Sequence, residues 1–507
     1  MDFRAVSIVR DQARDRGDSP ALVAGDRTLT YADLHERSSR LAQALRAHGV
    51  GPCSRVCYVG KNHPEFAEVM FAAAKLGAVC APVNWRLTPE EIGAVIADAL
   101  APVTVAGPEF AAIAGDLPGT VVITGEPYEE LLVGTVADDP GYVGEADDVV
   151  LQLYTSGTTG VPKGVQLSNA NLALLSDLTA QWRLDPSSVS LVAMPVFHIG
   201  GSGWMLAGLA TGARGVLVAD PDPAGLVELI ERERVTNGFL VPAILQFMCA
   251  VPGAAERDYS ALRAIMYGAS PITTDVLKQV LATFRAPLFQ LYGMTETCGA
   301  ITQLDPDDHD PDGPRAHLMR SAGRPYPWVE LKIVDPATGE ELPPGESGEV
   351  WARTPQNTSG YWNRPAESAE LLPGDGWVRS GDAGHLDAEG FLFITDRIKD
   401  MIVTGGENVY PIEVENVLAG HPAIADVAVI GVPDETWGET IAAIVVRRPG
   451  EATSAEEIIV WAKERLAGFK RPRRVDFTDA LPRNPSGKIL KKELRRPYWA
   501  GRDRHVG

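Results

Sequence analysis

Apolar and polar positions alternate along the first part of the chain in a way that predicts helices and strands in turn. After Thr30, a residue type that caps helices, apolar residues recur on one helical face between positions 34 and 45. Residues 55–59 and 78–83 are short apolar runs typical of buried strands, and the run 64–76 between them suits a helix. Such alternation predicts a parallel sheet covered by helices on both faces.

The pattern changes towards the C-terminus. Residues 328–354 alternate around a turn rich in Pro and Gly, which predicts antiparallel hairpins and a small β-barrel-like subdomain. Beyond this stretch, helices are predicted near 412–418 and 455–466, and strands at 427–430 and 441–446. We therefore predict an α/β protein with two domains. Residues 1–397 form a large N-terminal domain of parallel sheets, and residues 398–507 form a small, mobile α+β C-terminal domain.

Composition and charge exclude several classes of protein. The 507 residues carry a formal net charge of -21, which argues against general nucleic-acid binding because that function needs a basic surface. Residues 1–10 do not resemble a secretory signal, and no apolar run approaches the roughly 20 residues needed to span a bilayer. The five cysteines are scattered and odd in number, so we expect reduced thiols and a cytoplasmic protein.

The segment with the most chemical information follows a predicted strand at 149–154. Its glycines let the backbone approach an anion, and its hydroxyls, N–H groups and lysine can donate to phosphates. The segment reads Tyr154-Thr155-Ser156-Gly157-Thr158-Thr159-Gly160-Val161-Pro162-Lys163-Gly164. A plain Gly/Thr-rich turn is the simpler alternative. A Walker A loop is excluded because Gly164 follows Lys163, and the spacing of the glycines does not give a dinucleotide-binding fingerprint. The segment therefore predicts a polyphosphate loop of another kind.

This loop closely resembles the signature of the adenylate-forming superfamily, which includes acyl- and aryl-CoA synthetases, luciferases and adenylation domains of nonribosomal peptide synthetases. The resemblance runs from Thr30 to Lys488, and further motifs appear in the family's order. It implies that the protein binds ATP and Mg²⁺ and forms an acyl-adenylate. It also implies a C-terminal domain that changes position between two half-reactions.

Two motifs resemble the family's adenine and metal sites. Gly268-Ala269-Ser270-Pro271 follows an apolar strand and, apart from the resemblance, suits a simple strand-to-helix turn. Within the family it forms the wall against which adenine rests. The second motif reads Gln290-Leu291-Tyr292-Gly293-Met294-Thr295-Glu296. Here Tyr292 can stack on a purine, Thr295 can donate to a phosphate, and Glu296 can coordinate Mg²⁺. We expect Thr155 to share the metal site with Glu296.

The remaining nucleotide residues are predicted in the C-terminal half. By resemblance, Asp382 and Arg397 bind the ribose hydroxyls, and Lys399 lies at the domain hinge, although an exposed turn is an equal alternative for Lys399. The Gly-rich segment 404–411 resembles a loop that moves towards the thiol tunnel. Lys488, in a Pro-x-x-Pro-x-Gly-Lys context, is the lysine we expect to serve the first half-reaction by neutralising the carboxylate and the α-phosphate.

The predicted acyl pocket contains one histidine. A lone histidine is more often a satisfied core residue, and no second His or Cys offers metal spacing. By resemblance, we interpret His198 as positioning the acid or gating the tunnel, and not as a general base. Around it we expect glycines that leave room and apolar side chains that contact the acyl group: Gly200, Gly201, Trp204, Tyr267 and Met294. No Asp appears before Pro242 to hold an ammonium group, so an amino acid is the less favoured substrate.

The sequence therefore predicts an acid–thiol ligase that activates a hydrophobic fatty acyl or aryl acid with MgATP and transfers it to coenzyme A. Open alternatives are a carrier protein or an amine as acceptor, an unusual acid such as nitrite, and a nucleotide-binding regulator without catalysis. Two basic clusters, 470–474 and 491–496, suit CoA phosphates or an acidic membrane surface, but a solvated basic face explains them more simply. A homodimer is a further expectation.

Overall fold

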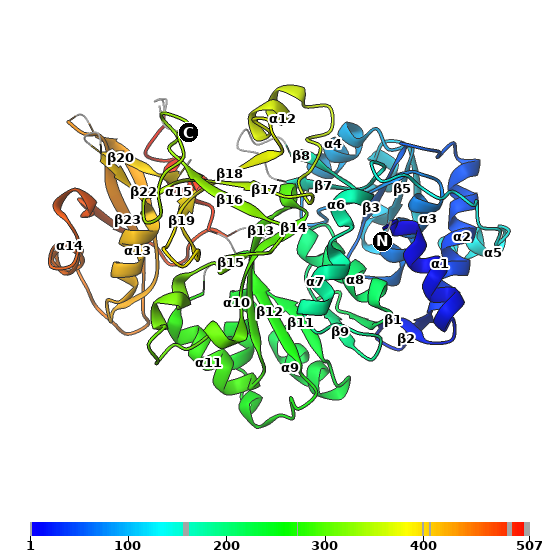
Figure 1. The fold of residues 1–507 in the computed structure, drawn as a ribbon, viewed down its shortest axis with the longest axis horizontal. Coiled ribbons are helices and arrows are strands. Elements are labelled where there is room, and N and C mark those ends of the chain that lie inside the picture. Colours follow the sequence, from blue (N-terminus) through cyan, green and yellow to red (C-terminus); the bar gives the residue numbers. More distant parts are fainter. Residues whose placement is uncertain are drawn as a thin grey trace. The chain divides into compact units, whose positions relative to one another are not determined.

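A computed structural model describes residues 3–155, 162–270, 272–397, 400–404, 407–434, 436–483 and 489–500. The chain forms two compact units (Figure 1). Unit 1 contains Met1–Glu330 and Ala352–Val378, and unit 2 contains Leu331–Trp351 and Arg379–Gly507. The domain boundary that the sequence places at 397/398 stays a prediction.

The larger sheet of unit 1 has nine strands, of which six neighbours run parallel in the order β13-β12-β11-β9-β10-β1. Antiparallel strands flank them, with β14 and β15 at one edge and β2 at the other. From edge to edge the strands are β15 (Arg324–Pro325), β14 (Gly299–Leu304), β13 (Leu288–Met294), β12 (Ala264–Gly268), β11 (Asn237–Leu240), β9 (Val189–Val192), β10 (Arg214–Leu217), β1 (Pro20–Ala24) and β2 (Arg27–Thr30).

The second sheet of unit 1 has six strands and is parallel except for its last strand. Its order is β6 (Thr120–Ile123), β5 (Val103–Ala106), β3 (Arg55–Val59), β4 (Val79–Val83), β7 (Val149–Thr155) and β8 (Lys163–Ser168), with β8 antiparallel to β7. The strands predicted at 55–59 and 78–83 are confirmed as β3 and β4. The predicted parallel sheets are therefore present as two separate sheets.

The helices of unit 1 follow the predicted pattern. Helix α2 (Tyr31–Ala47) begins with a capping box between Thr30 and Asp33, and α3 (Pro64–Lys75) lies between β3 and β4 in the chain. All twelve residues of α3 are buried because the helix contacts β1 of one sheet and β3, β4 and β7 of the other. The other helices are α1 (Ala5–Arg16), α4 (Pro89–Ala99), α5 (Glu126–Val133), α6 (Asn169–Leu172), α7 (Leu175–Gln181), α8 (Ile199–Thr211), α9 (Pro223–Arg232), α10 (Pro242–Cys249), α11 (Thr274–Phe284) and α12 (Pro365–Leu371).

The described part of unit 2 contains two smaller sheets and three α-helices. A four-stranded sheet has the order β16 (Glu330–Val334), β17 (Gly348–Arg353), β18 (Trp377–Leu386) and β19 (Leu392–Arg397), which confirms strands in the predicted hairpin region. The second sheet joins β21 (Glu407–Val409), β20 (Ile402–Thr404), β23 (Gly438–Arg447) and β22 (Ile424–Asp434), with β24 (Arg474–Phe477) parallel to β23. The helices are α13 (Pro411–Ala419), α14 (Ala455–Lys463) and α15 (Lys491–Arg495).

The long hairpin of β22 and β23 explains why its sequence reads as continuous apolar runs. Val427 and Val429 belong to the core on one face, together with residues of α13 and α14. Ala428 and Ile430 belong to a second cluster on the other face. A strand that is buried on both faces shows no alternation of apolar and polar residues. Among the described residues, no helix is long and apolar enough to cross a membrane.

Candidate active site

Several predicted site residues follow the carboxyl ends of neighbouring parallel strands in unit 1. His198 lies after β9, Gly268 ends β12, and Met294 ends β13, while β11 lies between β9 and β12. Because these strands are parallel, their carboxyl ends meet at one edge of the sheet, where ligands bind in open α/β folds. The structure thus brings the predicted acyl and adenine residues to one edge.

The predicted adenine wall depends on a close backbone approach. A Cβ atom on Gly268 would lie 2.3 Å from the carbonyl oxygen of Leu291, so only glycine fits there. The next residue, Ala269, is exposed and has a φ of 64°, in the left-handed region that residues other than glycine rarely adopt. Such backbone strain is commonly found at functional sites. Ser270 is half-buried, and Pro271 lies outside the described residues.

The end of β13 has the same kind of constraint. A Cβ atom on Gly293 would lie 1.8 Å from the carbonyl oxygen of Gly299, and the β13–β14 register shifts between Tyr292 and Gly293. Tyr292, Met294 and Thr295 are partly exposed at this edge, as is Gln290 on the same strand, whereas Glu296 is only 7% exposed. The motif therefore places partly exposed side chains next to one buried carboxylate.

The predicted phosphate loop begins and ends on two antiparallel strands. Strands β7 and β8 pair so that Thr155 stands opposite Lys163, and Tyr154 stands opposite Gly164. The loop residues between the strands lie outside the described residues, including the predicted nucleotide ligands Ser156, Gly157, Thr158, Thr159 and Gly160. Thr155 and Lys163 are thus the two described ends of the predicted loop.

A side chain that the sequence did not single out connects this hairpin with Glu296. The Tyr361 hydroxyl donates to Glu296 Oε1 at 2.9 Å, and the ammonium of Lys163 lies 5.2 Å from the centroid of the Tyr361 ring. Desolvation, followed by the nearby Glu296 carboxylate, raises the pKa of Tyr361 well above its usual value. The phenol is therefore protonated at neutral pH and can donate.

The arrangement fits a magnesium ion that arrives with its nucleotide. Within the described part of the chain, no group of three or more His, Cys, Asp or Glu side chains forms a metal cage. Mg²⁺ is commonly held by one or two carboxylates together with substrate phosphates. Glu296 is a single buried carboxylate whose short helix, η3 (Thr295–Thr297), contacts β8 at the phosphate hairpin.

The base of the hairpin is anchored by a polar network in unit 1. The Tyr154 hydroxyl donates to Asp98 Oδ2 at 2.9 Å and accepts from Gln152 Nε2 at 2.9 Å. The Trp362 indole N–H donates to the Asp98 carbonyl at 2.9 Å, and its ring lies 3.4 Å from the guanidinium carbon of Arg55. These contacts fix β7, the strand immediately before the predicted loop.

His198 is held neutral at physiological pH. Its ring packs on Phe197 at a centroid distance of 4.6 Å, and Arg86 lies 5.8 Å from the Phe197 ring. Desolvation of the imidazole, and then the charge of Arg86, lower the pKa of His198 to about 4. A neutral imidazole can donate one hydrogen bond and accept one, which suits a positioning role.

Aromatic side chains fill much of the predicted acyl pocket region. A Cβ atom on Gly200 would lie 2.7 Å from Phe239 Cε1, so the Phe239 ring occupies the space beside this glycine. Phe239 packs against Trp204 at a centroid distance of 6.4 Å, and Trp204 packs against Trp182 at 5.7 Å. At Gly201 a Cβ atom would lie 2.1 Å from the Pro195 carbonyl oxygen. The glycines therefore allow close packing, and the ring beside Gly200 is Phe239, a residue that the sequence analysis did not assign.

Behind this edge lies a second histidine that the sequence analysis missed. His309 Nδ1 lies 2.8 Å from the Asp305 carbonyl, so it must donate there, and Nε2 then accepts from the Tyr267 hydroxyl at 2.9 Å. Burial lowers the pKa of His309, which agrees with this neutral tautomer. Tyr267 is 1% exposed, and its place in the acyl pocket stays a prediction.

The ribose and lysine predictions fall in unit 2. Asp382 is 5% exposed on β18, where its N–H donates to Ser380 Oγ at 3.0 Å, and its backbone pairs with Arg397 on β19. The side chain of Arg397 lies outside the described residues, as do Lys399 and Lys488. Their predicted roles stay predictions.

Unit 2 also presents exposed and partly exposed aromatic and basic side chains. Trp437 is 42% exposed, and the guanidinium carbon of Arg473 lies 4.6 Å from its ring centroid. Phe469, at 39% exposure, and Lys470 lie in the short helix η7 (Gly468–Lys470), just before Arg473 in the chain. We call Trp437, Phe469, Lys470 and Arg473 the aromatic–basic patch.

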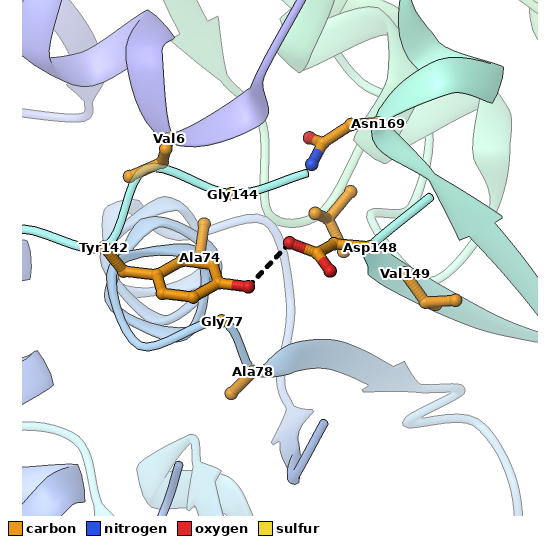
Figure 2. Close-up of a pocket in the computed structure, with 10 residues that line it drawn as sticks. Val6, Ala74, Gly77, Ala78, Tyr142, Gly144, Asp148, Val149 and Asn169 are labelled. Atoms are coloured by element: carbon orange, nitrogen blue, oxygen red, sulfur yellow. Dashed lines mark hydrogen bonds between the residues drawn. The ribbon is translucent and has the colours of Figure 1, made fainter. Parts of the chain in front are cut away.

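A small cavity in unit 1 has a structural role (Figure 2). It holds about 10 Å³, enough for a single water, and is lined by residues of α1, α3 and β7. The Tyr142 hydroxyl donates to Asp148 Oδ2 at 2.7 Å beside it, and Gly77 permits the close approach of the Tyr142 ring. The cavity is too small for an acyl or nucleotide substrate.

Comparisons with known proteins agree with this geometry. The family model described as AMP-binding enzyme matches residues 9–362, and the AMP-binding enzyme C-terminal domain matches residues 413–488. A fatty acid–[acyl-carrier-protein] ligase of Streptomyces coeruleorubidus is 41% identical, over 97% of this chain and 96% of that protein. A feruloyl-CoA synthase of an Amycolatopsis species is 40% identical, over 96% of this chain and 97% of its own length. The crystal structure of ATP-bound MatB from Rhodopseudomonas palustris superposes with a TM-score of 0.88 at 30% identity, covering 97% of this chain and 99% of MatB.

Proposed function

The chain belongs to the AMP-binding enzyme family, and we propose on that premise that it activates a hydrophobic carboxylic acid with ATP and transfers the acyl group to coenzyme A. The observation that carries the proposal is the contact of Tyr361 with both Lys163, at the end of the phosphate hairpin, and Glu296. These contacts support a single site in which Lys163 would meet the phosphates and Glu296 would hold their metal ion.

The first half-reaction forms an acyl-adenylate. A carboxylate oxygen of the acid bonds to the α-phosphorus of ATP, the bond from that phosphorus to the β-phosphate bridging oxygen breaks, and pyrophosphate leaves with the electron pair. We assign Thr155, Thr159 and Lys488 to align the phosphates and to neutralise their charge. Glu296, with Thr155, would hold Mg²⁺, which when bound offsets the negative charge of the phosphates.

The second half-reaction transfers the acyl group. The thiol sulfur bonds to the acyl carbon, the bond from that carbon to the AMP oxygen breaks, and the thiol proton passes to solvent. We propose that the C-terminal domain turns about Lys399 between the two steps, since Lys488 and the thiol need the same side of the adenylate. Neutral His198 would orient the acid, with a pKa too low for a general base near pH 7.

The aromatic–basic patch supports coenzyme A as the acceptor. An exposed Trp437 offers a face on which a purine can stack, and Arg473 beside it offers a charge for phosphates. A carrier protein is the second candidate acceptor, because the Streptomyces coeruleorubidus relative is named an acyl-carrier-protein ligase. The two candidates differ in whether free coenzyme A accelerates turnover.

Substitution of Arg473 tests the acceptor. R473A removes one exposed cation of the aromatic–basic patch, so we expect the KM for coenzyme A to rise about threefold to tenfold, the effect of losing one ordinary hydrogen bond. Acid-dependent pyrophosphate release without coenzyme A should not change. The matched control is R465A, because Arg465 also stacks on a tryptophan of unit 2, Trp461, at 3.6 Å. Equal effects of R473A and R465A on this KM would contradict a coenzyme A site at the patch.

The acid is proposed to be hydrophobic and of aryl or fatty acyl type. The wall of Phe239, Trp204 and Trp182 supports this because aromatic faces bury apolar area and stack on aryl rings. The test is pyrophosphate release from ATP with a panel of alkyl, aryl and amino acids, and with nitrite. Pyrophosphate release that does not depend on any acid would contradict the ligase proposal and favour a nucleotide-binding regulator. Release with nitrite alone would identify that unusual acid as the substrate.

The proposal also includes a cellular location and an oligomeric state. We infer a cytoplasmic location, because the five cysteines of the chain suit a reducing compartment where ATP and coenzyme A are present. The homodimer stays a prediction, and sedimentation of the purified protein is the measurement that checks it.

A further inference from the structure

A segment far from the recognised motifs extends the phosphate hairpin. The N–H of Gln166 on β8 donates to the Gly360 carbonyl at 3.1 Å, and the N–H of Trp362 donates to the Gly164 carbonyl at 2.7 Å. Val165 and Tyr361 form an antiparallel bridge between these two bonds. Residues 358–362 thus pair with β8 directly beside Lys163, the end of the predicted phosphate loop.

The same segment fixes the backbone of the metal-site motif. The N–H of Thr358 donates to the Glu296 carbonyl at 2.8 Å, and the Thr358 hydroxyl donates to the Gln166 carbonyl at 2.5 Å. Glu296 and β8 are therefore joined through Thr358, although 130 positions separate Gln166 from Glu296 in the chain. The predicted metal ligand Glu296 and the strand that carries Lys163 are therefore held in one fixed arrangement.

The Tyr361 side chain bridges the functional groups themselves. Its hydroxyl donates to Glu296 Oε1 at 2.9 Å, and its ring lies 5.2 Å from Lys163 Nζ, within the range of a cation–π contact. The backbone of Tyr361 is fixed in turn, because its N–H donates to Ser368 Oγ at 2.9 Å and Gly360, with φ 128°, allows the approach of Ser368. A phenol has few rotatable bonds, so it holds both contacts at a set spacing.

We propose that Tyr361 is a positioning residue that sets the orientation of the Glu296 carboxylate and the place of the Lys163 ammonium for MgATP. The inference rests on the proposed function. The two contacts have separate consequences. The hydroxyl restrains the carboxylate and therefore serves the metal ion, whereas the ring holds the ammonium and therefore serves the phosphates.

Two substitutions separate these contacts. Tyr361→Phe keeps the ring and removes the hydroxyl. It should reduce the gain in ATP affinity that Mg²⁺ provides and leave the affinity for ATP without metal unchanged. Tyr361→Leu removes both contacts and should weaken ATP binding with and without metal. The control is Tyr326→Phe, which removes a buried hydroxyl of unit 1 that donates to Gln303 Oε1 at 2.9 Å.

The experiment is calorimetric titration of the full-length protein with ATP in Mg²⁺ and in EDTA. The wild-type ratio of the two dissociation constants measures the contribution of the metal. We expect Y361F to lower this ratio about tenfold to hundredfold, as the loss of a hydrogen bond to a charged group would do. The half-saturating Mg²⁺ concentration for pyrophosphate release should rise by a similar factor, with Y326F unchanged in both.

The outcomes separate this inference from the function on which it rests. A wild-type protein that releases pyrophosphate only with acid, combined with a Y361F ratio equal to the wild-type ratio, would overturn the role of Tyr361 alone. A wild-type protein without acid-dependent release would overturn the proposed function instead. Because Y361F removes a single oxygen atom, its binding ratio remains a valid test even if Y361L does not fold.

Discussion

Adding a methyl group at Gly200 tests how the wall of the predicted acyl pocket is built. The new Cβ would lie 2.7 Å from Phe239 Cε1, whereas carbon atoms in contact prefer about 3.5–4.0 Å. The ring cannot retreat freely because Phe239 packs against Trp204, and Trp204 packs against Trp182. Overpacking of this kind costs about 1–3 kcal/mol, which corresponds to roughly 5- to 150-fold in an equilibrium constant.

We expect part of this cost to appear in acid recognition. G200A pushes the Phe239 ring towards the bound acid and should lower kcat/KM for the acid at least about fivefold. F239A removes six ring carbons and should favour longer acids, by about fourfold for each added methylene at about 0.8 kcal/mol of burial. In the double variant G200A/F239A the collision is absent, so G200A should have almost no further effect.

The measurement is kcat/KM for pyrophosphate release with a homologous series of acids. The control is G208A in the same helix, where a Cβ atom would make an ordinary contact of 3.4 Å with Ser190 Oγ. The coupling between positions 200 and 239 should reach about 1 kcal/mol, a size typical of residues in contact. Strictly additive effects, or a G208A variant as impaired as G200A, would refute the steric reasoning.

Three further outcomes follow from the site. G293A should abolish acid-dependent pyrophosphate release, because its Cβ would lie 1.8 Å from the Gly299 carbonyl oxygen, and a variant with wild-type kcat would show that this backbone can move. Because the pKa of His198 is about 4, H198N should lower kcat/KM without altering its pH dependence between about 5.5 and 8. If the wild-type profile falls on the acidic side of pH 6.5 and H198N loses this fall, the prediction is wrong. Because the folded pKa of His198 is lower than its unfolded pKa of about 6.5, its contribution to stability is complete above pH 6.5 and is lost as the pH falls towards 4. The thermal unfolding temperature of H198N should therefore depend less on pH between these values.

The sequence predicted those elements whose signals are local. The capping box at Thr30, the apolar strand at 55–59 and the helix starting at Pro64 all appear at the predicted positions. The strands predicted at 427–430 and 441–446 are longer in the structure, as β22 and β23. Here Gly431 and Pro433 resemble a turn in the sequence, yet they pair with β23 within one continuous hairpin.

Site residues could be predicted from the sequence where the backbone geometry allows only one residue type. Gly268 and Gly293 are glycines because a neighbouring carbonyl oxygen takes the place of a side chain, so each marks a motif. Tyr361 and His309 leave no such mark. Each acts through one side-chain contact with a partner distant in the chain, and neither the spacing nor the residue type indicates that partner.

The same difference separates the residues predicted for adenylation, which depend on backbone contacts, from those predicted for the choice of acid, which depend on side-chain contacts. The nucleotide motifs at Gly268 and Gly293 depend on close backbone approaches, which tolerate few substitutions. The contact of Phe239 with Trp204, proposed as a wall of the acyl pocket, depends on side-chain packing, which can be rebuilt without disturbing the strands beneath it. Relatives named for a fatty acid with a carrier protein and for feruloyl-CoA are 41% and 40% identical to this chain, so overall identity does not choose between those substrates. We propose that the choice follows from the side chains that line the acid and the thiol, and G200A, F239A and R473A test three residues proposed for these places.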